Sequence, residues 1–425
     1  MKMTGLNALV SRLRQNATIV ILCTSVAVMM MGTGLVTPVL PQFARSFNVS
    51  ITMVGLLVTA FGVARIAGDI PAGRLAERLG RRPVIIISPL VIAAGAFAAG
   101  LATNFWQLTI FRLVQGFGSA LFTTAAMIIT ADLSTHDNRA RLMGYYLGSV
   151  LIGTGLGPTF GGFIAQFFGL RAPFFAFALL SAAASVWAYF QLKETRLVVS
   201  SEKVLATGPA VAEQADPPAS VHSRHSNPSL GATQLLRNPN FILIAAITFS
   251  VFFTRTGALY QMVPLLASER LGANASRIGL ALTVAGIVNL LTLQVSGRLS
   301  DHFGRKIVLV PGCLTMAAFV GLLAITYDYQ LLLIACVLDG LGIGMSSGPA
   351  SAYMTDIVPR EQYAKSISVY RTIGDAGMVI GPIILGWFTD LRGFTFALLL
   401  WTGGLVLMAI VFQLFAVEPP RRKSV

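Results

Sequence analysis

Six ionisable side chains lie inside long apolar blocks of this 425-residue chain, and their types and surroundings make them the first candidates for chemistry. They are four arginines and two aspartates: Arg65, Arg112, Arg255, Arg371, Asp339 and Asp375. A charged side chain at the centre of a bilayer costs about 2.5–3.5 kcal/mol on insertion scales. Six such charges cannot face lipid, so we expect them to form pairs or to line a wet cavity.

The two aspartates are candidates for carrying a proton. A carboxyl group in apolar surroundings can exchange an arginine partner for a proton when the protein changes conformation. Asp339 has no acid or base within one helical turn, so we place it first. Asp375 lies four residues after Arg371, where the two can pair on one helix face, and a static structural pair is the alternative interpretation. The excess of arginine favours an anionic or zwitterionic substrate.

Twelve apolar segments must position these side chains. Only 11% of the residues are charged and 55% are hydrophobic, whereas soluble domains carry about a quarter charged residues. About 20 apolar residues suffice for a helix to cross a bilayer. The composition therefore predicts an all-α polytopic membrane protein with twelve transmembrane helices. We expect an N-terminal six-helix bundle over 1–193, a cytoplasmic linker over 194–238 and a C-terminal six-helix bundle over 239–425.

The net charge of +14 comes mainly from Lys and Arg residues in the loops that flank the apolar segments. Most of the 31 Lys and Arg residues flank the apolar segments on one side, and the other side holds five: Arg45, Arg171, Arg270, Arg277 and Arg392. This asymmetry places the basic loops and both termini in the cytoplasm, and the compact loops favour a bacterial inner (plasma) membrane. The charge is thus a topology signal, and no nucleic-acid partner is expected. The three cysteines lie in apolar blocks, and neither metal-ligand spacing nor a nucleophile–base set is visible, which argues against an enzyme.

The two halves of the chain align without gaps, in one constant register. Gly55 pairs with Gly279 in this alignment, and Gly157-Pro158 pairs with Gly381-Pro382. Each half holds six spans, so the repeats run parallel. Parallel repeats related by an axis along the membrane normal are a transporter architecture, with the substrate site between them.

A loop motif occurs once in each half. Residues 73–82 read GRLAERLGRR and residues 297–306 read GRLSDHFGRK. Both resemble the loop signature of the major facilitator superfamily, and Glu77 replaces the usual aspartate. The resemblance implies a gate latch that favours the outward-facing state, whereas a topology determinant plus a turn is the alternative. The latch residues are Gly73, Glu77, Arg81, Asp132, Gly297, Asp301, Arg305 and Asp356, with Asp132 a natural partner for Arg81.

Two further motifs resemble the twelve-span drug:proton antiporter branch of this superfamily. The fifth span holds Gly153, Gly157-Pro158 and Gly161, which the resemblance links to kinking, close packing and control of leak, with Gly381-Pro382 as the echo in the eleventh span. Mere tight packing is the alternative. The fourth span carries R-x-x-Q-G-x-G from Arg112, and the resemblance implies that this arginine assists proton transfer.

The sequence therefore predicts a secondary active transporter, with proton-coupled export of a small organic molecule or drug by alternating access. Asp339, Asp375, Arg371 and Arg112 are the coupling candidates, and the substrate-cavity candidates are Arg65, Arg255, Tyr260, Gln261 and Gln115. The partners are the substrate, protons and lipid, without cofactor or metal, and we expect a monomer. One alternative is uptake or exchange of an organic anion or metabolite on the same fold. Another is a non-transporting membrane sensor or scaffold.

Overall fold

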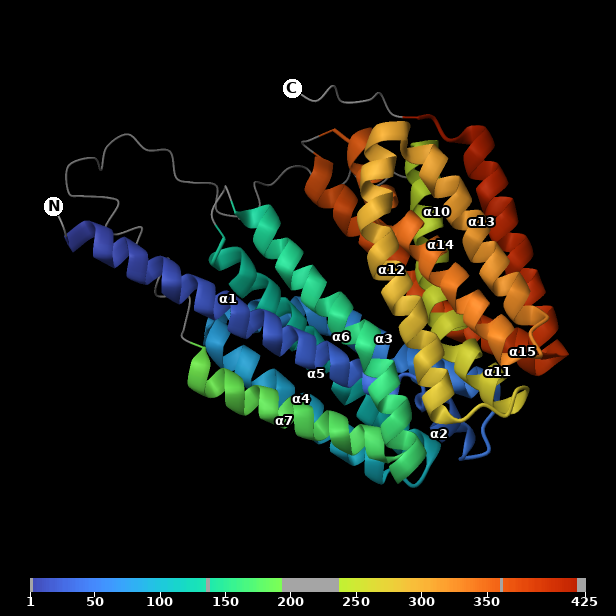
Figure 1. The fold of residues 1–425 in the computed structure, drawn as a ribbon, viewed down its shortest axis with the longest axis horizontal. Helices are drawn as coiled ribbons and strands as arrows, with labels where there is room; N and C mark the ends of the chain where they lie inside the picture. The colour runs from blue at the N-terminus through green and yellow to red at the C-terminus, as the bar shows by residue number, and fades with distance from the viewer. Residues whose placement is uncertain (1–2, 135–137, 193–236, 360–361, 419–425) are drawn as a thin grey trace.

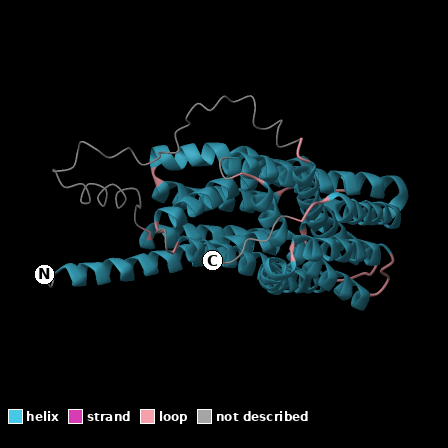
Figure 2. Ribbon diagram, turned by 90° about the horizontal axis from the view of Figure 1, so that it is seen from above, coloured by secondary structure: helices cyan, strands magenta, loops and turns pink. Residues whose placement is uncertain are grey.

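Helices make up almost all of the part of the chain that the structure describes. A computed structural model describes residues 3–134, 138–192, 237–359 and 362–418, and every element in that part is a helix or a loop (Figure 2). The linker expected over 194–238 lies outside the described residues except for its last two positions.

The described part of the first half contains seven helices. They are α1 (Met3–Val36), α2 (Leu40–Arg45), α3 (Ile51–Leu79), α4 (Arg81–Leu101), α5 (Phe105–Asp132), α6 (Arg139–Phe168) and α7 (Ala172–Gln191). The second half contains α10 (Pro239–Phe253), the π-helix η1 (Thr254–Met262), α11 (Val263–Glu269), α12 (Ala275–Phe303), α13 (Arg305–Ala324), α14 (Tyr329–Ile357) and α15 (Tyr363–Phe415).

Eleven continuous helical stretches of the described chain are long and apolar enough to cross a membrane. The last of them, 366–415, is 50 residues long, more than twice the length that a bilayer requires. It divides at Gly393, whose positive φ of 82° is not helical. Since α15 is two spans in series, the structure contains the twelve predicted spans.

The internal repeat is visible in the helix ends. In the register of the sequence alignment, the first residue of α3 pairs with the first residue of α12, and the last residue of α3 pairs with the last of α12. The caps repeat too, because Ser50 accepts a hydrogen bond from Met53 N and Asn274 accepts one from Arg277 N. Two positions that this register pairs are called repeat-equivalent below.

The two halves form two helix bundles that converge at one end (Figure 1). They meet along two helix pairs, α3 with α15 and α6 with α12. We call the end where α3 and α12 begin the closed end. The opposite end, where α3 and α12 finish and the loop motifs lie, we call the basic end; there the two bundles separate in Figure 1.

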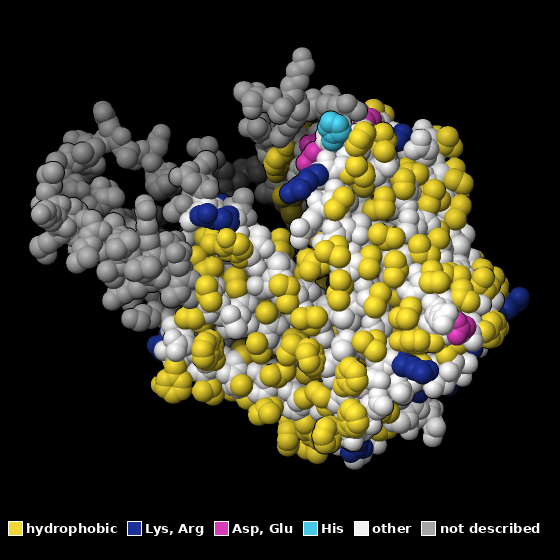
Figure 3. All heavy atoms as spheres, in the orientation of Figure 1, with side chains coloured by type: hydrophobic (Ala, Val, Ile, Leu, Met, Phe, Trp, Pro, Cys, Tyr) yellow, Lys and Arg dark blue, Asp and Glu magenta, His cyan; other side chains and the backbone are white. Residues whose placement is uncertain are grey.

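Apolar side chains cover the face of both bundles seen in Figure 3, and the charged side chains lie toward the two ends. Many of the exposed residues are large, for example Phe167, Phe190, Leu291 and Leu407, all more than 60% exposed. An apolar surface of this extent is stable only in contact with lipid. The outer surface therefore agrees with the membrane-spanning fold.

Candidate functional site

The closed end is held by hydrogen bonds between the halves. Arg45 of α2 and Glu269 of α11, which are repeat-equivalent, form an ion pair with 2.9 Å between Nε and Oε1. Asp390 of α15 accepts hydrogen bonds from Ile51 N at 2.9 Å and Thr52 N at 2.8 Å, at the start of α3. This carboxylate satisfies two backbone donors that the first turn of a helix leaves unpaired.

Repeat-equivalent glycines bring the halves into backbone contact. A Cβ added at Gly55 would overlap the Pro382 carbonyl, and one added at Gly279 would overlap the Pro158 carbonyl. The two prolines therefore lie at the interface between halves. The glycine face predicted in α6 packs within the first half, since Gly157 lies against Gly34 and Met31 of α1 and Gly161 lies against Leu35. In the second half, Gly381 lies in the same way against Phe253.

At the basic end, the loop motifs contain ion pairs that join residues of the same half. Arg81 Nε donates to Asp132 Oδ2 at 3.0 Å. In the second half, Arg305 Nε donates to Asp356 Oδ2 at 3.1 Å, and its Nη1 donates to Asp301 at 2.5 Å. Glu77, the counterpart of Asp301, is exposed and makes no hydrogen bond to the described residues. These pairs hold each loop motif to a neighbouring helix end of its own half.

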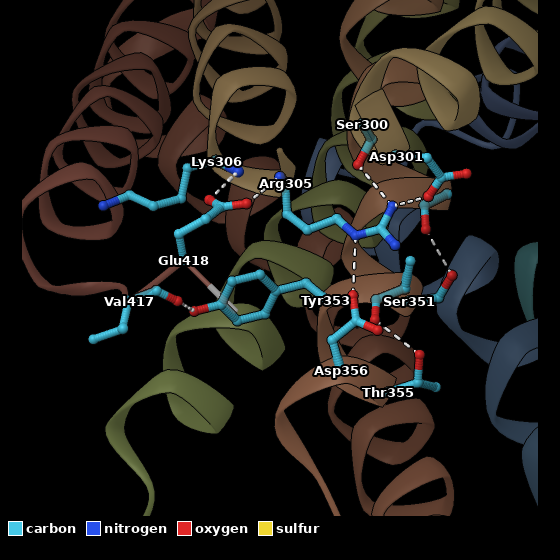
Figure 4. A network of polar contacts seen from close by, with 12 residues as sticks. Ser300, Asp301, Arg305, Lys306, Ser351, Tyr353, Thr355, Asp356, Val417 and Glu418 are labelled. Atoms are coloured by element: carbon cyan, nitrogen blue, oxygen red, sulfur yellow. Dashed lines mark hydrogen bonds and ion pairs between the residues drawn. The ribbon is translucent and has the colours of Figure 1, made fainter. Parts of the chain in front are cut away.

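The second motif also anchors the end of the described chain (Figure 4). The Glu418 carboxylate accepts hydrogen bonds from Arg305 N and Lys306 N, the first backbone donors of α13. The Tyr353 hydroxyl donates to the Val417 carbonyl at 2.7 Å. A carboxylate at a helix N-terminus is favoured by the helix dipole.

A pocket between the halves contains Asp339, the first coupling candidate. Its walls are Leu151, Thr154, Gly155 and Pro158 of α6 on one side, and residues of η1, α12 and α14 on the other, including Arg255, Tyr260, Asn289 and Asp339. The Asp339 side chain is 1% exposed, and its Oδ1 has no hydrogen-bond partner among the described residues. A buried carboxylate oxygen without a partner is costly, so this oxygen is suited to a ligand or a proton.

The π-helix η1 positions Arg255 in that pocket. Arg255 and Tyr260 are five residues apart, and the wide turns of a π-helix bring such positions to one face. Arg255 Nε donates to the Tyr260 hydroxyl at 3.1 Å, and its guanidinium lies 5.7 Å from the centre of the Tyr260 ring. Tyr260 thereby holds the guanidinium within electrostatic reach of Asp339 without an ion pair between them. Sequence periodicity carried no signal for this π-helix.

Two predicted cavity residues lie elsewhere. Gln115 is fully buried inside the first half, where its Nε2 donates to the Gly95 carbonyl at 3.1 Å and its Oε1 accepts from Arg112 Nη1 at 2.9 Å. Gln261 points across the interface at the closed end, and its Nε2 donates to the Ile51 carbonyl at 3.1 Å. Both amides donate to backbone carbonyls, and neither is among the residues that wall the Asp339 pocket.

Arg112 forms no ion pair with Asp339 or Asp375 in the described part of the chain. Its side chain is 6% exposed and stacks over the Phe61 ring at 4.5 Å, a cation–π contact. None of the described carboxylates pairs with it.

Arg371 and Asp375 do not form the expected pair within one helix. Neither side chain makes a hydrogen bond or an ion pair with another described residue. They lie instead in a wider group of charges with Arg65 and Asp69 of α3, since Arg65, Asp69 and Arg371 all influence Asp375 electrostatically. Asp69 was not among the predicted site residues, although it lies four residues after Arg65 inside the second apolar segment.

Comparison with known proteins places the chain among transporters. The model of the Major Facilitator Superfamily matches residues 22–274 and 252–425. The chain is 26% identical over 383 residues to "Multidrug resistance protein 2" of Bacillus subtilis (strain 168), covering 89% of this chain and 90% of that protein. The fold resembles a bacterial homologue of the human lysosomal transporter Spinster in an inward-facing, unoccupied conformation, with a TM-score of 0.72, 16% identity and coverage of 94% and 95%. It also resembles a D-xylose-proton symporter, with a TM-score of 0.70, 16% identity and coverage of 96% and 99%.

Proposed function

Because the chain belongs to the Major Facilitator Superfamily and is a membrane transporter, we propose that it exports a small organic molecule in exchange for protons by alternating access. The observation that carries this proposal is the buried Asp339 carboxylate, with an oxygen free of hydrogen bonds, in a pocket walled by both halves. Such a carboxylate can bind a proton or a donor group of the substrate, but not both at one oxygen. Competition of this kind couples the two flows in opposite directions. The resemblance to a multidrug resistance protein supports export.

Alternating access requires the pocket to open to each side in turn. We propose that the basic end faces the cytoplasm of an inner membrane, with both termini on that side, as the distribution of Lys and Arg favours. The conformation described above is then inward-facing, with its exit blocked by the contacts of the closed end. Since one chain supplies every wall of the pocket, we propose that the functional unit is a monomer of two bundles joined by the linker.

Arg255 supports one rival on the same fold, namely uptake or exchange of an organic anion. When Asp339 carries a proton, Arg255 is the charge left in the pocket, and it attracts an anion. A proton and an anion then bind together, and both cross in the same direction. The rival differs from the main proposal in the sign of the coupling.

Proteoliposomes with an internal pH dye distinguish these functions. The protein is challenged with ethidium (a cation), chloramphenicol (neutral) or 5-carboxyfluorescein (an anion), with Asp339→Asn beside the parent. Asp328→Asn is the matched control, since Asp328 caps α14 outside the pocket. We expect a proton flux opposite to the substrate flux, lost in Asp339→Asn and kept in Asp328→Asn. Proton flux and substrate flux in the same direction support anion uptake or exchange, and transport without any pH change refutes proton coupling.

A further inference from the structure

Two antiparallel helices at the interface between the halves carry the same charge pattern. Arg65 and Asp69 are four residues apart in α3, and Arg371 and Asp375 are four residues apart in α15. None of these four side chains lines the Asp339 pocket. Charges within a membrane helix are costly without a partner, so their placement on two neighbouring helices requires an explanation.

The contacts at the closed end set the register of α3 against α15. Gly55 lies against the Pro382 backbone, and the Thr59 hydroxyl donates to the Val379 carbonyl at 2.5 Å. Gly62 lies against the side chain of Met378. In antiparallel helices, each step forward along one is matched by a step back along the other, so the paired numbers keep a nearly constant sum. Continuing the register by one turn places Arg65 opposite Asp375, and a further turn places Asp69 opposite Arg371.

The surroundings of these four residues agree with that register. Asp375 lies within electrostatic reach of Arg371 and also of Arg65 on the other helix. Tyr146 of α6, which is 7% exposed, lies within reach of Arg65, Arg371 and Asp69. The four charges therefore gather around one point, where the helices run from the closed end toward the separated basic end. In this conformation, Asp69 has one hydrogen bond, accepted from the Thr124 hydroxyl at 3.4 Å.

We propose that closing of the basic end joins Arg65 to Asp375 and Asp69 to Arg371, and that these two ion pairs across α3 and α15 are a gate that stabilises the outward-facing conformation. Each charge then has an opposite charge directly across the interface, and closing excludes the water that screens them here. The gate concerns the conformational cycle and not the substrate pocket, so it holds for either direction of transport.

A thiol pair one turn beyond the charges reports closing. The register places Gly73 opposite Ile367, and a Cβ added at Gly73 meets no atom within 4 Å. Gly73→Cys with Ile367→Cys is made in a background in which Cys23, Cys313 and Cys336 are replaced by alanine. The rate of disulfide formation with a copper–phenanthroline oxidant, measured in the full-length protein in liposomes, then follows the population of the closed basic end.

Charge reversal at one cross-interface pair tests the gate. We expect Arg65→Asp and Asp375→Arg each to slow cross-linking at least fivefold, because each places like charges across the interface. The double variant Arg65→Asp/Asp375→Arg restores the attraction and is expected to reach at least half the parent rate. The alternative that each helix forms its own pair predicts the opposite, since the double variant has like charges four apart in both helices and is then the slowest.

Arg74→Asp is the matched control. Arg74 is an exposed arginine of the same helix, α3, but it is not one of the four charges of the proposed gate. We expect its rate to stay within twofold of the parent. Four results overturn the gate: no cross-link in the parent thiol pair, single reversals without effect, a double variant slower than both singles, or an equal loss in Arg74→Asp.

Discussion

Substitution of Asp390 is expected to shift the equilibrium between the inward-facing and the outward-facing conformation most directly. Its carboxylate, on α15, accepts hydrogen bonds from Ile51 N, Thr52 N and the Thr52 hydroxyl at 2.9, 2.8 and 2.5 Å, all at the start of α3 in the other half. These bonds break when the closed end opens, because α3 and α15 then separate at that end. Asp390→Ala therefore removes stabilisation from one conformation and leaves the other unchanged.

The magnitude follows from the role of a helix cap. Removing a side chain that caps a helix N-terminus costs about 0.5–2 kcal/mol, and a carboxylate near the positive end of the dipole adds to this in the same direction. Asp390 is exposed but accepts three hydrogen bonds, so we take about 1–2 kcal/mol for the whole contact. Since about 1.4 kcal/mol is a tenfold change in an equilibrium constant, Asp390→Ala shifts the equilibrium toward opening of the closed end by roughly 5- to 30-fold.

Distance measurements between spin labels at the basic end test this value. The exposed, repeat-equivalent residues Leu79 and Phe303 accept the labels as Leu79→Cys and Phe303→Cys. We expect Asp390→Ala to raise the ratio of the short to the long distance by the stated factor. Asp328→Ala is the control, because Asp328 caps α14 inside one half, and its ratio is expected to match the parent. An unchanged ratio in Asp390→Ala, or an equal change in the control, refutes the reasoning.

Three further predictions follow from particular contacts. Gly157→Val forces a side chain into Gly34 and Met31 of α1 and is expected to cost about 1–3 kcal/mol, lowering the midpoint of thermal unfolding in detergent, whereas Gly144→Val on the same helix meets open space and is expected to keep it. Glu418→Ala removes the carboxylate that holds the start of α13, so limited proteolysis after Phe415 is expected to become several-fold faster; an unchanged cleavage rate would mean that Tyr353 holds the segment alone. Tyr260→Phe removes the hydrogen bond that Arg255 donates and is expected to weaken proton-linked transport with little change in thermal stability, and full transport in this variant would contradict the role given to Tyr260.

Much of the architecture follows from local rules that the sequence makes visible. Spans of apolar residues must form helices in lipid, because every backbone donor needs a partner within its own segment. The constant register between the halves predicted the parallel repeat, and it is retained at helix ends and caps and in the contacts of Gly55 and Gly279 with the two prolines. Arg81 and Asp132 also lie together as their positions at neighbouring helix ends indicated.

The departures arise where tertiary packing decides. Gln115 and Gln261 were predicted to line the cavity because polar side chains are scarce in apolar spans. In the structure, each side-chain amide donates a hydrogen bond to a backbone carbonyl in a packed interface. The spacing of Arg371 and Asp375 is compatible with pairing in one helix, but Arg65 and Asp69 of α3 also lie within electrostatic reach of Asp375. The π-helix that brings Arg255 and Tyr260 together leaves no periodic signal in nine residues. The relative population of the two conformations depends on contacts between halves, which no local pattern encodes.

Transport driven by a pH gradient tests the central claim most directly. Proteoliposomes containing the parent or Asp339→Asn are loaded at acidic pH and diluted into alkaline buffer with the compound that gave the proton flux, and accumulation of the compound inside is measured. In a second assay, exchange of the compound is measured with equal pH on both sides. We expect the parent to accumulate the compound, and Asp339→Asn to exchange it without accumulating it. Accumulation by Asp339→Asn equal to that of the parent would contradict the account, because the proton would then be carried by another group.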